Sequence, residues 1–229
     1  MAPVVVLSWH PAPIKSLAQV VDAKMPEHWF YGERNLLYTG QVQGRRVSFV
    51  SVPVGAPGTV MMMEEMIVCG ARAFIGLGWA GSLQATAPAG TFIMPMSCIS
   101  EEGTSAHYID KRTPVGPSSR LAKIIQESCK EEGVNPQQGP VWTTDAPYRE
   151  LMSKIEEYHR RGILGVDMET STMYALGRVR NVDVCNLLVV RDELWLEWRP
   201  AFGSPQLREA TRKTQQVILR VLTKNLFED

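Results

Sequence analysis

Apolar segments of strand length alternate along this chain with segments of helical periodicity, and this alternation is its strongest constraint on the fold. The strand candidates are 4–9, 38–42, 46–52, 71–81 (running into a glycine-rich turn), 90–99, 140–145, 163–167 and 182–190, and the helix candidates are 56–70, 117–132, 148–161, 170–180 and 205–226. Strands that alternate with helices form layered structures with a buried sheet. The pattern predicts one domain over 1–229, a three-layer α/β/α sandwich with a mixed, largely buried central sheet.

Composition limits the classes of partner. Lys and Arg together number 24 and so do Asp and Glu, so no overall field attracts nucleic acid or an anionic membrane. No apolar run approaches the ~20 residues of a membrane span, and the apolar start MAPVVVLSW lacks the basic residues of a signal peptide. The four cysteines are far apart and form no CxxC pair, which is typical of a reducing compartment. We therefore expect a cytoplasmic protein with neither a nucleic-acid nor a membrane partner.

Two carboxylates stand one residue apart in GVDMETSTMYALG, residues 165–177. If the chain is still extended at Met168, then Asp167 and Glu169 point to one side of the sheet and Met168 to the other. One interpretation is a capped helix start, in which either acid accepts hydrogen bonds from free backbone N–H groups. The other is a ligand site, because open α/β sheets bind ligands at the carboxyl ends of their strands.

A second acidic segment favours the ligand site. The strand candidate 182–190 leads directly into Arg191, Asp192 and Glu193, and Asp192 follows Glu169 by 192 − 169 = 23 residues. A helix of about eleven residues and a strand of about nine fit that interval, and a right-handed crossover then returns the chain to the same end of the sheet. The spacing predicts two neighbouring strand ends that present carboxylates over one crevice.

Seven segments together resemble one family, the purine nucleoside and uridine phosphorylases of the trimeric–hexameric class. They are RNLLYTG (34–40), VGAPGTVMMMEEMIVCGAR (54–72), GLGWAGSLQ (76–84), EEGTSAHY (101–108), TTDAPYRE (143–150), GILGVDMETSTMYALG (162–177) and VVRDEL (189–194). EGTSAHY and TTDAPYRE are closest to the uridine phosphorylase-like branch. The resemblance implies cleavage of the N-ribosidic bond of a small-molecule nucleoside, with no metal or organic cofactor and with inorganic phosphate as the possible co-substrate.

The resemblance also assigns roles to residues. Glu169 matches the glutamate that binds the ribose 2′ and 3′ hydroxyls, and Met168 matches the methionine that packs on the sugar. Asp192 matches the aspartate that protonates a departing purine, and Tyr148 lies in the loop that lines the base pocket, where Pro147 replaces an aromatic residue. Arg34 matches an arginine that reaches a neighbouring subunit's phosphate, which implies a homo-oligomer, either a dimer or a hexamer.

The phosphate-binding segments depart from the family pattern. In SWHPAPIK, Trp9 and His10 replace the glycine and aspartate of the first phosphate loop, and in GLGWAG, Gly76 replaces an arginine and Trp79 a hydroxyl residue. The anion-binding candidates are Arg34, Gly78, Trp79 and Arg191. Arg191 also has a simpler interpretation, an ion pair with Asp192 or Glu193 that would hold Asp192 ionised and make it a poorer acid.

Three functions therefore remain open at the level of sequence. The chain is a phosphorylase with a remodelled phosphate site, a hydrolase in which water replaces phosphate, or a non-catalytic nucleoside-binding homologue. For the hydrolase, His10 and Glu102 are the candidates for positioning water, although His10 also fits a structural histidine at a strand end. The base is open too, because Asp192 favours a purine whereas the TTDAPYRE segment favours uridine.

Overall fold

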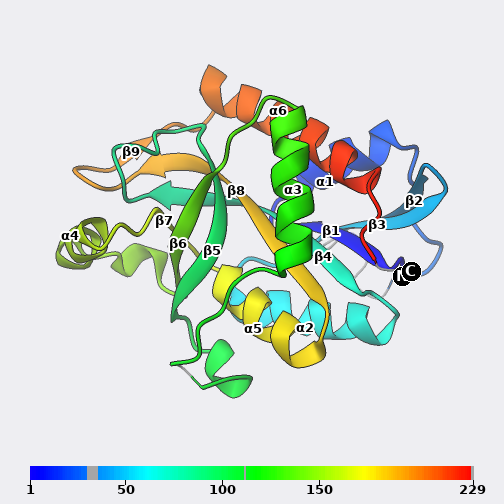
Figure 1. Cartoon of the computed structure of the whole chain (residues 1–229), viewed down its shortest axis with the longest axis horizontal. Helices are drawn as coiled ribbons and strands as arrows, with labels where there is room; N and C mark the ends of the chain where they lie inside the picture. The colour runs from blue at the N-terminus through cyan, green and yellow to red at the C-terminus, as the bar shows by residue number, and fades with distance from the viewer. Residues whose placement is uncertain (30–35, 111, 228–229) are drawn as a thin grey trace.

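The computed structural model of the chain describes residues 1–29, 36–110 and 112–227. Its strands and helices alternate for most of the chain (Figure 1). The elements are β1 (Val4–Ser8), α1 (Pro11–Val20), β2 (Leu37–Val42), β3 (Arg45–Ser51), α2 (Ala56–Val68), β4 (Ala73–Ser82), β5 (Phe92–Glu101), η1 (Ser105–His107), α3 (Ser119–Glu131), β6 (Gln137–Thr144), η2 (Pro147–Arg149), α4 (Met152–Arg160), β7 (Gly165–Asp167), α5 (Thr170–Arg180), β8 (Asp183–Glu193), β9 (Arg199–Pro200) and α6 (Pro205–Leu222).

The strands form one mixed sheet in the order β2-β3-β1-β4-β7-β6-β5-β8-β9. An additional pairing of β4 with β8 closes five of these strands, β4, β7, β6, β5 and β8, into a ring. Within that ring β4 and β8 are parallel to each other, whereas β5 and β7 run antiparallel to them. The predicted mixed sheet is confirmed, and its closure is a feature that the sequence pattern did not indicate.

Helices cover both faces of the sheet, as the three-layer prediction requires (Figure 1). Along β1, Val4 and Val6 pack in the apolar cluster formed with α1, α3 and α6, whereas Val5 and Leu7 pack in the cluster formed with α2 and α5. Alternate residues of a strand point to opposite faces, so a run of apolar residues is what a strand buried on both sides requires. Each fully buried side chain of this kind contributes about 1.5–3 kcal/mol of transfer free energy.

Strand β4 corrects one prediction. The expected glycine-rich turn at its end does not form, and the strand continues through Gly76, Gly78 and Gly81 to Ser82. Pairing with β1 on one side and β8 on the other holds this segment extended. Its glycines instead allow side chains of neighbouring segments to approach the backbone closely.

Strand β5 and helix α1 also differ from expectation. A proline inside a strand indicates an edge strand or a bulge. Pro95 lies at a bulge in an interior strand, with a register shift between Pro95 and Ser97. Helix α1 was not predicted, because its segment contains Pro11 and Pro13. Both prolines lie in the first turn, where the missing N–H costs no helical hydrogen bond.

Candidate active site

The junction of β7 and α5 carries the first pair of acids. The Asp167 carboxylate accepts hydrogen bonds from the Thr143 hydroxyl at 2.7 Å, from the Thr170 backbone N–H at 2.9 Å and from the Thr170 hydroxyl. The capping interpretation therefore holds for Asp167, which binds the N-terminal turn of α5. Burial raises the pKa of Asp167, while the hydrogen bonds from the two threonines oppose that shift.

Glu169 has a different environment. Its side chain is only 5% exposed, and Oε1 accepts a hydrogen bond of 2.6 Å from the backbone N–H of Gly55 at the start of α2. Burial, followed by the nearby negative charge of Asp167, raises the pKa of Glu169 to about 8. The result is a buried carboxyl group that titrates near neutral pH, beside the half-buried Met168.

Asp192 lies in the same region, but the predicted pairing of the two strands that carry the acids is wrong. Strands β7 and β8 are not neighbours; β4 lies between them, antiparallel to β7 and parallel to β8. The register nevertheless places Val166 opposite Gly81, and Gly81 opposite Asp192, along one line across the three strands. With strands spaced by ~4.8 Å, the backbones of Val166 and Asp192 are roughly 10 Å apart. The two groups of acids thus flank the carboxyl end of β4.

The surroundings of Asp192 favour the protonated acid. Burial raises its pKa, and a hydrogen bond of 2.9 Å from Trp198 Nε1 and the charge of Arg191 only partly oppose this. The Arg191 guanidinium lies over the rings of Trp79, at 4.8 Å, and Phe202, at 4.6 Å. No ion pair between Arg191 and a carboxylate occurs in the described part of the chain, so the simple ion-pair interpretation is wrong there.

Glu150 is a titratable residue close to Asp192 that was not among the predicted site residues. Its side chain is half-buried, and burial together with the charge of Asp192 raises its pKa to about 7. The available signal was an acidic residue within TTDAPYRE, near the start of the helix predicted over 148–161. Tyr148, which the resemblance assigned to base binding, is by contrast 100% exposed in the single chain.

The segments that correspond to the phosphate-binding segments of the resembled family, 8–15 and 76–81, are packed with side chains. Trp9 Nε1 donates a 2.7 Å hydrogen bond to the Thr59 hydroxyl, and the Trp9 ring packs so closely on Gly78 that a Cβ there would lie 2.8 Å from Cζ3. A Cβ on Gly76 would lie only 2.2 Å from Asn186 Oδ1, so β4 has no space for an arginine at that position. Trp79 lies beside His10, with ring centroids 5.2 Å apart.

The two candidates for positioning water are both engaged. The exposed His10 accepts a 3.2 Å hydrogen bond at Nδ1 from the Ala12 N–H and caps α1. The buried Glu102 accepts five hydrogen bonds, from the Ser100, Ser105 and Ser171 hydroxyls and from the backbone N–H groups of Thr104 and Ser105. Burial opposes ionisation of Glu102, but these donors hold its pKa below the usual value. Glu102 thus anchors the segment 100–105 to α5.

Arg34 lies outside the described residues. Across the ranges 1–29, 36–110 and 112–227, no group of three or more His, Cys, Asp or Glu side chains is arranged to hold a metal ion. In the same ranges, no helix has the length and apolar character needed to cross a membrane.

A partly ringed mixed sheet with helices on both faces, and acids at the β7–α5 junction and at the end of β8, define a nucleoside phosphorylase-like class of α/β protein. The chain belongs to the Phosphorylase superfamily, whose family model matches residues 4–223. The resemblance seen in the sequence is thereby confirmed.

Individual relatives agree with this assignment. The uridine phosphorylase of Treponema pallidum is 28% identical over 197 residues, which cover 81% of this chain and 76% of the relative. A DeoD-type purine nucleoside phosphorylase of Caldanaerobacter subterraneus is 28% identical over 200 residues, covering 85% and 84%. The crystal structure of uridine phosphorylase from Vibrio fischeri superposes with a TM-score of 0.84 at 24% identity, covering 97% of this chain and 92% of that one. This last similarity is one of fold.

Proposed function

We propose that this protein cleaves the N-ribosidic bond of a nucleoside by phosphorolysis and releases the free base and ribose 1-phosphate. The observation that carries the proposal is the half-buried Asp192, whose pKa is raised, in register with the β7–α5 junction that bears Glu169. The relatives named uridine and purine nucleoside phosphorylase support the reaction class. These two relatives are each 28% identical to this chain and are named for different bases, so experiment must identify the base that is released.

The proposed reaction assigns each acid a separate task. A phosphate oxygen forms a bond to C1′ while the C1′–N bond breaks and its electron pair moves to the base. Asp192 gives a proton to the base, and such general acid catalysis contributes about 10²–10⁴ in rate. Glu169 in its ionised form accepts hydrogen bonds from the ribose diol, because a carboxylate has two acceptor oxygens. Met168 packs against the sugar.

The phosphate needs a cation, and Arg191 is the best placed in the described residues. Its guanidinium lies over the rings of Trp79 and Phe202 and forms no ion pair within the described residues, so its N–H groups remain available to an anion. Trp79 would then support the phosphate ligand without binding phosphate itself. Arg34 of a neighbouring subunit is the second cation in this proposal.

A specific observation favours hydrolysis as the second candidate function. Trp9 covers Gly78, and Asn186 occupies the space beside Gly76, so two family ligands for phosphate are replaced by packed side chains. In this case water attacks C1′ and ribose is released. Glu150, with its pKa raised to about 7, would accept the proton of that water, since Glu102 is already bound by five donors.

The test is nucleoside cleavage with purine and pyrimidine panels, each in phosphate buffer and in phosphate-free buffer, with the sugar products separated. Phosphate-dependent ribose 1-phosphate supports the first proposal, and phosphate-independent ribose supports the second. Asp192→Asn and Glu169→Gln should each lower kcat/KM at least tenfold, whereas Glu209→Gln, on the exposed face of α6, should not. A protein that binds nucleosides without cleaving any of them would contradict both proposals.

A further inference from the structure

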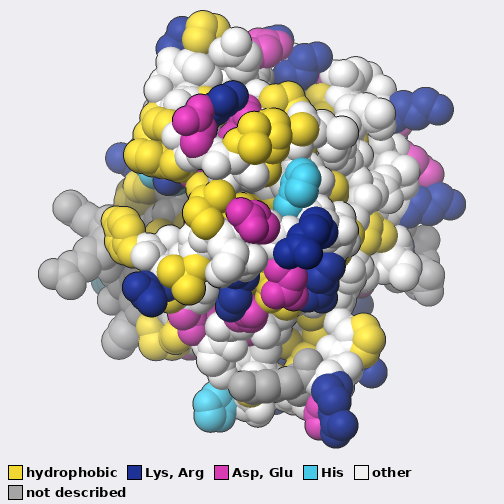
Figure 2. All heavy atoms as spheres, turned by 90° about the vertical axis from the view of Figure 1, so that its left-hand side faces the viewer, with side chains coloured by type: hydrophobic (Ala, Val, Ile, Leu, Met, Phe, Trp, Pro, Cys, Tyr) yellow, Lys and Arg dark blue, Asp and Glu magenta, His cyan; other side chains and the backbone are white. Residues whose placement is uncertain are grey.

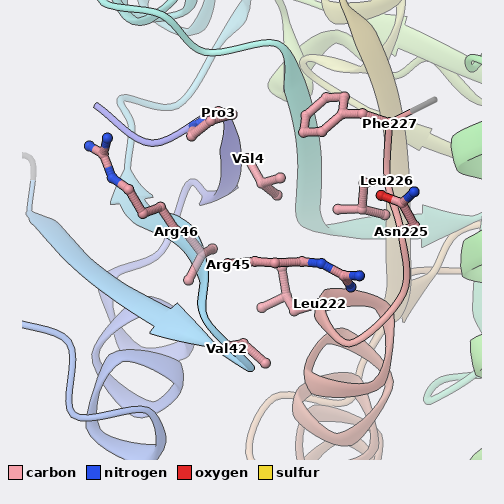
Figure 3. Close-up of a pocket in the computed structure, with 10 residues that line it drawn as sticks. Pro3, Val4, Val42, Arg45, Arg46, Leu222, Asn225, Leu226 and Phe227 are labelled. Atoms are coloured by element: carbon pink, nitrogen blue, oxygen red, sulfur yellow. The ribbon is translucent and has the colours of Figure 1, made fainter. Parts of the chain in front are cut away.

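A cavity of about 300 Å³ lies between the amino-terminal ends of β1 and β3 and the segment that follows α6 (Figure 3). Its apolar wall consists of Val4, Val42, Val47, Leu222, Leu226 and Phe227. Figure 3 shows Val4, Leu222, Leu226 and Phe227 around one space, with Arg45 extending along its edge. Ligand pockets typically measure about 300–1,000 Å³, so this one suits a small ligand.

Arginines border the cavity. Arg45 and Arg46 both line it, and the Arg72 guanidinium lies 4.7 Å from the ring centroid of Phe227. Arg45 Nη1 donates to the carbonyl oxygens of Thr223, at 2.8 Å, and Lys224, at 2.6 Å, and so holds its guanidinium beside the end of α6. Arg46 Nη2 donates to the Met1 carbonyl at 3.1 Å.

Several arginines of this chain pair with carboxylates, and the arginines beside this cavity differ from them. Arg161, Arg180, Arg199, Arg212 and Arg220 each form an ion pair. Within the described ranges, none is formed by Arg45, Arg46 or Arg72. Among the described residues, three guanidinium groups without a carboxylate partner therefore lie beside this apolar cavity.

We propose that this cavity binds a small amphiphilic carboxylate, with its hydrocarbon chain between β1, β3 and α6 and its carboxylate on Arg45, because the Arg46 side chain points away from the space (Figure 3). The apolar wall matches the chain, and an arginine fork matches a carboxylate because it offers two parallel N–H donors. The site is separate from the proposed active site. β1 runs from Val4 at the cavity to Ser8, roughly 13 Å away, before the chain reaches Trp9 and His10.

Octanoate is the probe, and octan-1-ol is its neutral match. We expect octanoate to bind the full chain in calorimetric titrations and to shift amide NMR signals of residues 42–47 and 222–227. Arg45→Gln should weaken octanoate binding about tenfold or more, the effect of losing a charge-assisted contact, and should leave octan-1-ol binding nearly unchanged. Arg160→Ala, which removes an exposed arginine of α4, is the control and should not change either affinity.

A second variant tests the cavity independently of charge. Val42→Trp places a large ring at the half-buried end of β2 and should abolish binding of both probes, with thermal melting confirming that the variant folds. The proposal is overturned if octanoate does not bind, if the Arg45→Gln variant binds it as well as the native chain, or if the shifted signals lie at residues 166–169 and 191–193 instead. Because nucleoside cleavage is not the readout, failure here leaves the proposed function unaffected.

Discussion

Asp167 and Glu169 are one residue apart, yet they have different partners. Asp167 is bound by Thr143 of the neighbouring strand β6 and by Thr170 at the start of α5. Glu169 instead contacts the start of α2, 114 residues earlier in the chain. The sequence could supply both the capping interpretation and the ribose-binding interpretation of this pair. It could not supply the raised pKa of Glu169, because that depends on burial by α2, a long-range contact.

The raised pKa of Glu169 predicts a pH dependence of stability. An acid whose folded pKa is raised stabilises the fold fully below its unfolded pKa, near 4.5, and loses that contribution as pH rises towards about 8. Glu169→Gln keeps an acceptor for the Gly55 N–H and cannot ionise. We expect its free energy of unfolding, relative to the native chain, to rise by more than about 1.4 kcal/mol between pH 5 and 8.

Urea titrations at several pH values measure this difference. Glu209→Gln is the control, because Glu209 is exposed and pairs with Arg212. An equal difference at pH 5 and pH 8 would show that Glu169 is not protonated in the folded state near neutral pH.

The stacking of Arg191 predicts an effect confined to phosphate. Arg191→Lys keeps the charge but loses the planar fork that rests on Trp79 and Phe202. Under the proposed phosphorolysis, we expect KM for phosphate to rise about tenfold while KM for the nucleoside changes little. Arg199→Lys, in the same hairpin and paired with Glu197, is the control. An unchanged phosphate KM would exclude Arg191 as a phosphate ligand.

At the scale of elements, the hairpin of β8 and β9 controls the acid at the end of β8. Asp192 pairs with Pro200 in the strand register, and Trp198 Nε1 donates to its carboxylate. The hydrogen bond from Trp198 lowers the pKa of Asp192. Trp198→Phe removes this donor, so the pKa of Asp192 should rise further. We therefore expect the alkaline limb of the kcat/KM profile to move to higher pH, since Asp192 stays protonated longer.

Trp195→Phe is the matched variant for this hairpin, because the Trp195 ring stacks on the ring of His159. Its pH profile should match that of the native chain. A shift of the alkaline limb to lower pH in Trp198→Phe would contradict the proposed role of Asp192 as the acid.

The close approach of Trp9 to β4 predicts a steric cost. In Gly78→Ala, the new Cβ would lie 2.7 Å from Leu188 Cδ2 and 2.8 Å from Trp9 Cζ3, so both side chains must move. We expect a loss of about 1–3 kcal/mol in the free energy of unfolding. Gly103→Ala is the control, because its new Cβ has only Asp145 Oδ2 nearby, at 3.8 Å. Equal stability of both variants would contradict the observed packing.

The elements were predictable where local pattern decides them. The helix 170–180 was predicted with the bounds that α5 shows, and the acid proposed to bind its free N–H groups, Asp167, accepts from the Thr170 N–H. β4 was misread at its end because Gly76 and Gly78 resemble turn residues when taken alone. Glycine is required at these positions because the side chains of Asn186 and Trp9 approach the backbone there. No local sequence pattern reveals such a tertiary contact.

At the scale of the whole molecule, the pairing of β4 with β8 determines how the site is assembled. The crossover rule predicted that Glu169 and Asp192 lie in one region at the ends of two neighbouring strands. The two residues do lie in one region, but β4 separates β7 from β8. Closure of a ring depends on contacts between residues some 110 positions apart, such as Ala73 with Asp183. A reading of successive segments could therefore predict the layers but not the ring.

The distribution of exposed apolar side chains predicts the association state. Tyr148, Leu151, Leu196, Trp198 and Phe202 are 49–100% exposed on segments beside Glu150 and Asp192. Figure 2 shows hydrophobic side chains among charged ones on the face that includes the side of α4. Gathered exposed apolar side chains mark interaction sites, and we propose that a second copy of the chain covers these.

Sedimentation velocity tests this association. We expect the native chain to sediment at a multiple of its 25.6 kDa mass, and Leu151→Asp combined with Leu196→Asp to shift it toward the monomer, because buried unpaired charges oppose association. Val68→Asp is the control, since Val68 is 87% exposed on α2 and is not one of these side chains. Dissociation by Val68→Asp alone would place the interface on α2 instead. If the native chain is a monomer, Glu150 and Asp192 form their site without a partner, and the expected contribution of a neighbouring Arg34 is wrong.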